Sequence, residues 1–244
     1  YDGVDAKHAA SRGIIVTNTP DVLNDEVADT TIALLISTVR RLYQAESHLR
    51  AGKWEAEGPF MLSPFSLRNR KVGLFGMGRI GQEIAKRLEP FKVEIGNHTR
   101  SKRAELSYTY YGSLKEMAQE VDILICIVPG TPETHKAINA DILSALGPNG
   151  VFINVGRGSS VDEDALLKAL QDGTIGAAGL DVFYAEPKVP AGFLSLPNVT
   201  LLPHVASASV PTRNAMADLV ADNVLGWLNE RKVVTPVPET PVKG

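Results

Sequence analysis

The sequence predicts an α/β domain built on a doubly wound parallel sheet, the Rossmann type of cofactor domain. Short segments of β type alternate along the chain with amphipathic helical segments, and most of the β-type segments are apolar throughout. Such strands are typical of a parallel sheet that helices cover on both faces. A glycine-rich turn also follows the first of these segments directly and opens a helical one, as in dinucleotide-binding folds.

The strands of this sheet are expected in chain order at 72–75, 93–95, 123–128, 151–155, 179–182 and 199–202. Between several of them, apolar residues recur with the period of a helix and share one face. These predicted helices are 80–88, 139–146 and 166–170. Strand and helix therefore alternate, as a doubly wound sheet requires.

Two flanking parts do not belong to this alternation. Asn24-Asp25-Glu26 resembles a helix start, and an apolar stripe continues to about Val39, so a long helix is expected there. A second long helix is expected from about Val210 to Leu228. Residues 54–70 are expected to form a loop, and 13–16 one short strand.

Composition excludes several classes of protein. Lys and Arg number 25 and Asp and Glu 28, so the net charge is −3, which argues against binding nucleic acid by neutralising phosphates. Apolar residues make up 44% of the chain, enough for a sizeable core. The longest strictly apolar run, 123–128, is far shorter than the about 20 residues of a membrane helix. The single Cys126 excludes an internal disulfide, and the chain does not open with a signal-peptide pattern, so a cytoplasmic protein is expected.

The glycine-rich turn has the pattern G-x-G-x-x-G over residues 76–81. Gly76 permits the tight turn, Gly78 lets the backbone approach a pyrophosphate, and Gly81 lets helix and strand pack closely. The start of the following helix supplies N–H groups and positive potential, so Arg79 and Ile80 belong to the expected site. The alternative is a glycine-rich turn without a ligand, but the strand–turn–helix context favours a dinucleotide site.

The tip of the next predicted strand decides which dinucleotide is preferred. An NAD site usually carries an acid about 20 residues after the turn, to bind the ribose 2′-hydroxyl. Here Asn97-His98-Thr99-Arg100 stands at the tip, and the nearest acid, Glu94, comes early in the strand. Arg100 offers a 2′-phosphate a charged fork, and its neighbours offer hydrogen-bond donors. We therefore expect NADP(H), with NAD(H) as a weaker alternative; a solvated basic loop is the other reading.

Three polar residues follow the last three predicted strands. Arg157, Glu186 and His204 each come after one of them. Ligands bind where the carboxyl ends of parallel strands meet, so these side chains are expected to converge there. Arg can hold a carboxylate or a ketone oxygen, His can exchange a proton near neutral pH, and a carboxylate beside the imidazole stabilises its charged form. Each residue alone could be a capping or surface side chain, but together beside a nucleotide turn they predict a catalytic site.

The chain resembles the D-isomer-specific 2-hydroxyacid dehydrogenase family over practically its whole length. Within the family it is most similar to the NADPH-preferring glyoxylate/hydroxypyruvate reductases and the hydroxyphenylpyruvate reductases. The resemblance implies that Arg157 binds the substrate carboxylate and carbonyl, that His204 is the acid/base, and that Glu186 is its partner. It also implies reduction of a small 2-oxo acid, such as glyoxylate or hydroxypyruvate, to the D-2-hydroxy acid by NADPH. The segments that carry it are 73–81, 154–163, 179–187 and 202–205.

The resemblance also implies further cofactor contacts and a second domain. Asp181 is expected near the nicotinamide carboxamide, and no metal site is expected. A second, flavodoxin-like substrate domain is implied, with residues 1–23 as a remnant of it and 207–244 as the return to it, around a dinucleotide-binding domain at 24–206. The family pattern places most of that domain before this segment, and a homodimer is expected. The other implied cofactor contacts are Val128, Pro129, Thr134, Val155, Gly156 and Ser207.

Two alternative functions stay open from the sequence. A binding protein similar to the C-terminal-binding-protein corepressors would keep Arg157, Glu186 and His204 but use the dinucleotide to control assembly. Those proteins bind NAD(H), so the missing acidic anchor counts against this alternative. A hydroxyphenylpyruvate reductase is the other, whereas formate dehydrogenases of this fold carry Gln where Glu186 stands.

Overall fold

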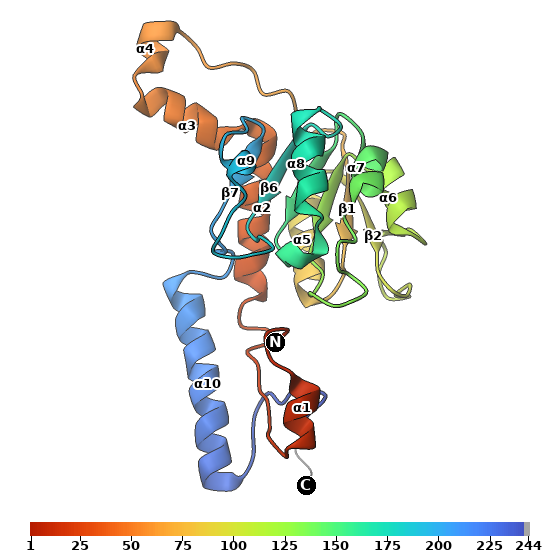
Figure 1. The fold of residues 1–244 in the computed structure, drawn as a ribbon, viewed down its shortest axis with the longest axis vertical. Coiled ribbons are helices and arrows are strands. Elements are labelled where there is room, and N and C mark those ends of the chain that lie inside the picture. The colour runs from red at the N-terminus through yellow and green to blue at the C-terminus, as the bar shows by residue number, and fades with distance from the viewer. Residues whose placement is uncertain (242–244) are drawn as a thin grey trace. The chain divides into compact units, whose positions relative to one another are not determined.

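Seven parallel strands form one sheet in the computed structural model, which describes residues 1–241 (Figure 1). Residues 242–244, the end of the predicted 207–244 segment, lie outside the described part. The strand order is β3-β2-β1-β4-β5-β6-β7, so the order reverses between β1 and β4. The strands are β1 (Lys71–Phe75), β2 (Glu94–His98), β3 (Thr109–Tyr110), β4 (Ile123–Cys126), β5 (Val151–Asn154), β6 (Ala177–Leu180) and β7 (Val199–Leu201). This sheet confirms the predicted fold class.

Helices cover both faces of the sheet. On one face, α2 (Asn24–Arg40) and α5 (Arg79–Leu88) bury apolar side chains against alternate residues of β1, β4 and β5. On the other, α6 (Leu114–Glu120), α7 (Ala140–Leu146) and α8 (Glu163–Gln171) pack against the intervening residues. In β4, for example, Ile123 and Ile125 face the first pair of helices, and Leu124 and Cys126 face the second group. Burial on both sides explains why these strands are apolar throughout.

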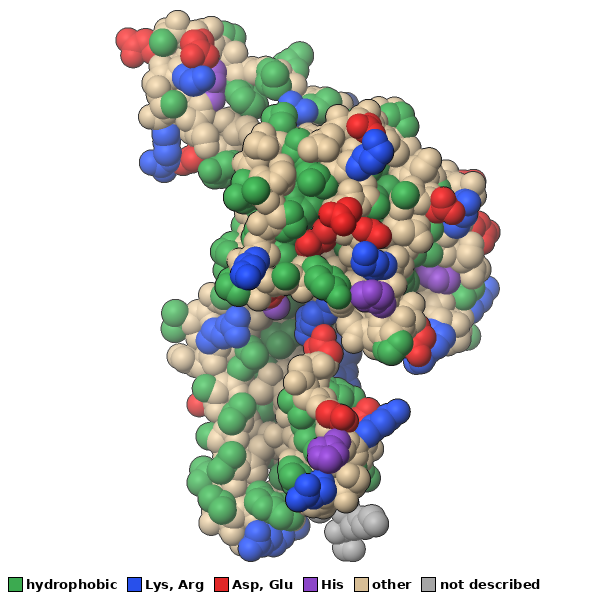
Figure 2. All heavy atoms as spheres, viewed as in Figure 1, with side chains coloured by type: hydrophobic (Ala, Val, Ile, Leu, Met, Phe, Trp, Pro, Cys, Tyr) green, Lys and Arg blue, Asp and Glu red, His purple; other side chains and the backbone are tan. Residues whose placement is uncertain are grey.

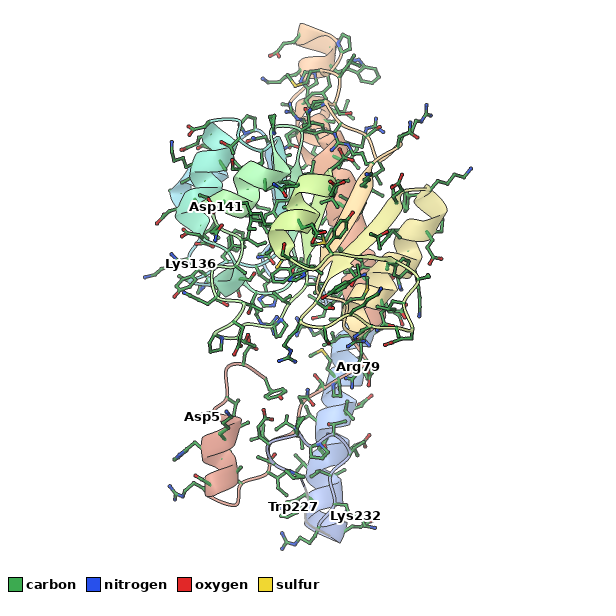
Figure 3. The ribbon with its side chains drawn as sticks, turned by 90° about the vertical axis from the view of Figure 1, so that its right-hand side faces the viewer. Asp5, Arg79, Lys136, Asp141, Trp227 and Lys232 are labelled. Carbon is green, nitrogen blue, oxygen red and sulfur yellow. The ribbon has the colours of Figure 1, made fainter. Side chains whose placement is uncertain are left out.

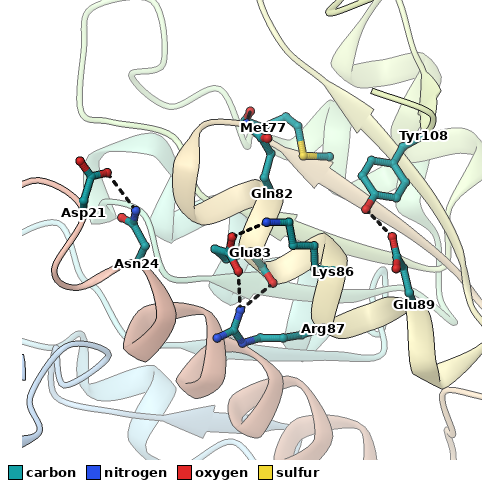
Figure 4. Close-up of polar contacts among 9 residues, drawn as sticks. All are labelled: Asp21, Asn24, Met77, Gln82, Glu83, Lys86, Arg87, Glu89 and Tyr108. Carbon is teal, nitrogen blue, oxygen red and sulfur yellow. Dashed lines mark hydrogen bonds and ion pairs between the residues drawn. The ribbon is translucent and has the colours of Figure 1, made fainter. Parts of the chain in front are cut away.

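Ion pairs on the surface of α5 supplement this packing. Arg87 Nη1 lies 2.9 Å from Glu83 Oε2, one turn away, and Arg87 also pairs with Asp29 of α2. Lys86 lies on the other side of Glu83, at 2.6 Å (Figure 4). The same close-up shows the hydroxyl of Tyr108 donating to Glu89 Oε1 at 2.7 Å. Burial, followed by this contact with Glu89, raises the pKa of Tyr108 to about 12.

The chain divides into two compact units. One comprises Ala28–Ala206 and holds the whole sheet; the other combines Tyr1–Val27 with the chain from Ser207 onward. In the second unit, residues near both ends of the chain meet, since the N–H groups of Val16 and Val237 bond to Thr240 Oγ1 and Val16 O. Its long helix α10 (Val210–Glu230) exposes apolar side chains such as Val224 and Leu228. Figure 2 shows apolar side chains on the surface where Figure 1 draws α10. Assignment of this unit to a substrate domain stays a prediction.

Short elements differ from the sequence-based predictions. Residues 13–16 form no strand. The next residue, Thr17, makes an isolated β-bridge with Pro236. The first residues of the predicted 54–70 loop, 54–57, belong to a short helix, α4 (Lys53–Glu57). Strand β3 was not predicted, because a two-residue edge strand has no apolar pattern of its own. The other elements that were not predicted are α6, described above, α1 (Ala6–Ser11), α3 (Leu42–Arg50), α9 (Ala191–Leu194), η1 (Glu89–Phe91) and η2 (Gly158–Ser160).

No helix within residues 1–241 is both long enough and apolar enough to cross a membrane. The longest, α10, carries charged and polar side chains along its length.

Candidate active site and nucleotide turn

The carboxyl ends of the central strands lie in one row. Strand register pairs Phe75 at the end of β1 with Cys126 at the end of β4, and Cys126 with Asn154 at the end of β5. The row continues from Asn154 to Leu180 of β6 and from there to Leu201 of β7. The segments after these strands therefore emerge at the same edge of the sheet. They include the glycine-rich turn, Arg157, Asp181 and His204.

The glycine-rich turn has the geometry of a phosphate-binding turn. Gly76 adopts φ = 107°, and a Cβ there would lie 2.6 Å from Ile127 O. A Cβ on Gly81 would lie 2.4 Å from Gly76 O, so close packing of strand and helix requires glycine at both positions. Gly78 differs, because a Cβ there would meet nothing within 4 Å. Its backbone faces open space at the start of a helix.

That helix, α5, begins without a side-chain cap. Gly78 is its N-cap and has no side chain to accept a first-turn N–H group. Arg79 and Ile80 are the first residues of the helix, and Figure 3 labels Arg79. An uncapped helix start with positive potential suits an anion. These features fit the pyrophosphate of a dinucleotide, with Gly78, Arg79 and Ile80 as the residues that would hold it.

Residues at the tip of β2 are not equivalent. Asn97 is only 3% exposed, and its side-chain amide donates to Thr109 O of β3 at 3.2 Å. His98 Nδ1 lies 3.0 Å from Tyr111 O, and its ring stacks on Phe75. Thr99 Oγ1 donates to Ser101 O at 2.7 Å. Arg100 is exposed. Among the residues expected to bind the 2′-phosphate, Arg100 therefore combines a positive charge with exposure to solvent. Asn97 and His98 instead bond to the segment of β3 and stabilise the edge of the sheet.

Glu94 lies at the wrong end of β2 to serve a ribose. It pairs with Lys71, whereas His98 at the other end pairs with Phe75 beside the glycine-rich turn. His98 lies four positions after Glu94 along the strand, roughly 13 Å away at the usual rise per residue. The strand tip therefore presents no carboxylate from Glu94.

The loop after β4 faces the loop after β5. Val155 donates its N–H to Cys126 O at 3.2 Å, and a Cβ on Gly156 would lie 2.7 Å from Val128 O. Glycine at 156 is therefore needed for this approach. Thr134 Oγ1 donates to Pro129 O at 2.6 Å and closes the loop that follows Val128. Burial raises the pKa of the Cys126 thiol to about 11, so the thiol stays protonated near neutral pH and is given no role in the site.

Arg157 is held by hydrogen bonds to residues on both sides of it in the chain. Its carbonyl accepts hydrogen bonds from Asn154 Nδ2 at 3.1 Å and from Ser160 Oγ at 2.7 Å. Its own Nη1 donates to Gly156 O at 2.8 Å. The guanidinium is half-buried, so it is oriented before any substrate binds.

Glu186 and His204 form a hydrogen-bonded pair. His204 Nδ1 lies 2.7 Å from Glu186 Oε2, and the Phe183 N–H donates to Glu186 Oε1 at 2.8 Å. Burial by itself raises the pKa of Glu186, but the hydrogen bonds from His204 and Phe183 and the charges of His204 and Arg157 outweigh it. The pKa of Glu186 is therefore lowered, and its carboxylate is ionised beside the imidazole. Because Nδ1 is engaged, Nε2 is the ring atom left to exchange a proton with a ligand.

His204 is anchored through Asp181. The backbone of His204 adopts φ = 54°, a left-handed conformation that costs on the order of 1 kcal/mol for a non-glycine residue. Asp181 O accepts the His204 N–H at 2.8 Å, and the Asp181 carboxylate accepts the N–H groups of Val205 and Ala206 at 2.8 and 3.0 Å. These bonds hold the left-handed turn in place. Burial raises the pKa of Asp181, against the lowering effect of the two N–H donors.

Several expected ligands stay predictions. Asp181 is fully buried, and the contact with the nicotinamide carboxamide is untested. Ser207 belongs to the other compact unit, and its expected cofactor contact stays a prediction too. No group of His, Cys, Asp or Glu within residues 1–241 could hold a metal ion.

The sequence analysis missed two functions of side chains at this edge. It gave no role to Glu163, whose Oε1 accepts the Tyr184 N–H at 2.8 Å. It also did not foresee that Asp181 anchors the His204 turn. The position of Glu163 in the first turn of a helix, shortly after Arg157, was the one available signal.

Residues 32–206 match the family model described as D-isomer specific 2-hydroxyacid dehydrogenase, NAD binding domain. The chain belongs to this family. Among the 2-hydroxyacid dehydrogenases, it is 46% identical to hydroxyphenylpyruvate reductase of Plectranthus scutellarioides and 44% identical to glyoxylate/hydroxypyruvate reductase A of Arabidopsis thaliana. Each alignment covers 97% of this chain and 75% of the relative.

A solved structure of the family is closely similar as well. It is the NADPH-dependent glyoxylate/hydroxypyruvate reductase of Sinorhizobium meliloti in complex with NADP and malonate, with 64% identity and a TM-score of 0.98. The match covers 100% of this chain and 76% of that one. The predicted resemblance is thus confirmed at the level of the family.

Proposed function

We propose that this 2-hydroxyacid dehydrogenase reduces a small 2-oxo acid, glyoxylate or hydroxypyruvate, to the 2-hydroxy acid with NADPH. The observation that carries this proposal is the 64% identity over the full chain with the Sinorhizobium meliloti enzyme named NADPH-dependent. The Arg157, Glu186 and His204 groups at the edge that holds the nucleotide turn support the same chemistry.

The roles of the site residues follow from their contacts. Arg157, already oriented by Gly156 O, would bind the substrate carboxylate and stabilise negative charge on the carbonyl oxygen. His204 would donate the proton at Nε2 to that oxygen, while the ionised Glu186 stabilises the imidazolium through Nδ1. When bound, NADPH supplies the hydride for the carbonyl carbon. The Gly78–Ile80 backbone would hold its pyrophosphate and Arg100 its 2′-phosphate.

Two substrates compete within this proposal. The relative with 46% identity is a hydroxyphenylpyruvate reductase, which favours an aromatic 2-oxo acid as the second candidate. The corepressor-like alternative has no comparable support, because the strand tip presents Arg100 and no carboxylate of Glu94.

The deciding experiment compares kcat/KM for glyoxylate, hydroxypyruvate and hydroxyphenylpyruvate on the complete protein, each with NADPH and NADH. We expect the smaller acids with NADPH to give the highest values. Preference for hydroxyphenylpyruvate would establish the second candidate, and absence of turnover with all three acids would support a binding protein.

A homodimer in the cytoplasm is also part of the proposal. Several apolar side chains of residues 42–62, which begin with α3, are exposed. A large exposed apolar surface is typical of a protein–protein interface. Sedimentation velocity tests the dimer. The exposed residues are Leu42, Tyr43, Leu49, Trp54, Met61 and Leu62.

A further inference from the structure

The peptide group between Phe183 and Tyr184 is held from several sides. Its N–H, that of Tyr184, donates to Glu163 Oε1 at 2.8 Å. The preceding N–H, that of Phe183, donates to Glu186 Oε1 at 2.8 Å. Two carboxylates from different elements therefore bind consecutive N–H groups, and one of them is the partner of His204.

Gly158 packs against the same peptide group. A Cβ on Gly158 would lie 1.9 Å from Phe183 C and 2.3 Å from Tyr184 N, which only glycine avoids. Gly158 follows Arg157 directly, and Ser160 Oγ bonds back to Arg157 O. The short segment from Arg157 to Glu163 therefore carries the substrate-binding guanidinium at one end and contacts the Phe183–Tyr184 peptide at two points.

The start of the helix that carries Glu163 is itself anchored. Glu163 lies in the first turn of α8, where Asp162 caps the helix by accepting the Ala165 N–H. Lys136, labelled in Figure 3, has its Nζ 3.3 Å from Asp162 Oδ2, so the helix start is tied to a neighbouring loop. Acidic side chains gather in Figure 2 where Figure 1 draws α8.

Charged groups surround Glu163 from several elements. Burial raises the pKa of Glu163, the Tyr184 N–H lowers it, and the charges of Asp164 and Glu186 raise it again. Asp164 and Glu186 are the charged groups that act on Glu163 directly. The elements packed around it carry further charged or titratable groups: Lys136 pairs with Asp162, His135 packs on Tyr184, and Arg157 and His204 act on Glu186.

We propose that Glu163 is a positioning residue: by accepting the Tyr184 N–H, it fixes the 183–186 turn, and so the Glu186 carboxylate, against the segment that carries Arg157. This inference rests on the proposed function, since it assigns Glu186 and Arg157 to one reaction. In this role Glu163 acts through the Tyr184 peptide, and it sets the distance between the group that binds the substrate and the pair that moves the proton.

The test uses three variants of the complete protein. Glu163→Ala removes the acceptor and the charge, Glu163→Gln removes the charge but keeps an acceptor oxygen, and Asp164→Ala removes a neighbouring exposed carboxylate. We expect Glu163→Ala to lower kcat about 10-fold with KM for NADPH within 2-fold, because misplacing a catalytic group slows the reaction. Glu163→Gln is expected to restore most of kcat, and Asp164→Ala to leave it unchanged. The pH profile of kcat should move further in Glu163→Ala than in Glu163→Gln.

A second readout needs no cofactor and no turnover. Amide hydrogen exchange at Phe183, whose N–H is held by Glu186, should become at least about 10-fold faster in Glu163→Ala but not in Glu163→Gln or Asp164→Ala. Faster exchange at Tyr184 alone, or equal kcat and pH profiles in all three variants, would overturn the inference. If the unmodified protein reduces none of the 2-oxo acids, the proposed function fails, while the exchange at Phe183 still decides the role of Glu163.

Discussion

The two halves of the sheet edge are built by different means. Beside β1 and β2, the backbone forms the candidate site: glycines at 76 and 81 let strand and helix pack closely, and the following helix begins at Gly78 without a side-chain cap. Beside β5, β6 and β7, side chains form it: Arg157 bonds to its neighbour Gly156, Glu186 pairs with His204, and the turn at His204 is held by Asp181 from a different segment. A backbone site depends on the absence of side chains, whereas a side-chain site depends on supports distant in sequence. The two halves should therefore fail differently when mutated.

The largest expected effect is on the side-chain half. His204→Ala removes the proton donor, and kcat should fall about 10²- to 10⁴-fold, the usual contribution of general acid catalysis. Affinity for NADPH should stay within 2-fold, because the nucleotide turn is formed by other segments. Steady-state kinetics and a fluorescence titration with NADPH measure the two quantities. Retention of more than a tenth of kcat would remove His204 from the mechanism.

A pair of glycine variants tests the backbone half. Gly78→Ala adds a methyl group that meets nothing within 4 Å, so the melting temperature should not change. Affinity for NADPH should fall about 100-fold, as expected for losing one or two charge-assisted hydrogen bonds to phosphate. Gly81→Ala is the contrast: its Cβ would lie 2.4 Å from Gly76 O, so the melting temperature should fall as well. Unchanged NADPH affinity in Gly78→Ala would show that the space beside Gly78 is not used by the cofactor.

The proposed preference for NADPH depends on one side chain beside the nucleotide turn, that of Arg100. Arg100→Ala should raise KM for NADPH roughly 10-fold, the lower end of the range for a charge-assisted hydrogen bond, because Arg100 is exposed. KM for NADH should stay the same, since NADH has no 2′-phosphate. Equal changes for both cofactors would mean that Arg100 does not distinguish them.

The smallest expected effect is on how the free energy of unfolding depends on pH. The pKa of Glu186 is lowered from 4.5 in the folded protein, so its ionisation stabilises the fold above that value, and this contribution is lost as pH falls through the folded pKa. Glu186→Gln lacks the ionisation. Its free energy of unfolding should therefore fall less steeply below pH 4.5 than that of the unmodified protein. Chemical unfolding of both proteins across this range measures the difference; parallel curves would contradict the lowered pKa.

Sequence reasoning reached the backbone half more fully than the side-chain half. Gly76 and Gly81 each have a local reason to be glycine, since a Cβ there would meet a backbone oxygen, so the pattern itself describes the turn. Arg157, Glu186 and His204 could be predicted as a group because strand ends of a parallel sheet share one edge. The supports of those side chains could not be predicted, since the contact between Glu163 and Tyr184 joins residues 21 positions apart. The left-handed backbone of His204 also depends on Asp181, from a different strand.

Strand ends were predicted less well than strand centres. Strand β6 begins at Ala177 and ends at Leu180, two residues before the predicted segment on each side. Its small side chains lack a β signal, and Gly179 is required because a Cβ there would lie 2.5 Å from Thr38 Oγ1. Asp181 and Val182 then lie in the loop that leads to Glu186, not in the sheet.

At the tip of β2, the residue that holds the sheet together is distinct from the residue proposed to select the cofactor. The buried Asn97 amide joins β2 to β3, and a carboxylate in its place would lose the donor to Thr109 O. Arg100 lies outside the strand and is exposed, so it does not join the strands of the sheet. Cofactor preference can thus drift, or be redesigned, through substitutions at the exposed end of this segment without weakening the sheet, provided that position 97 is left alone.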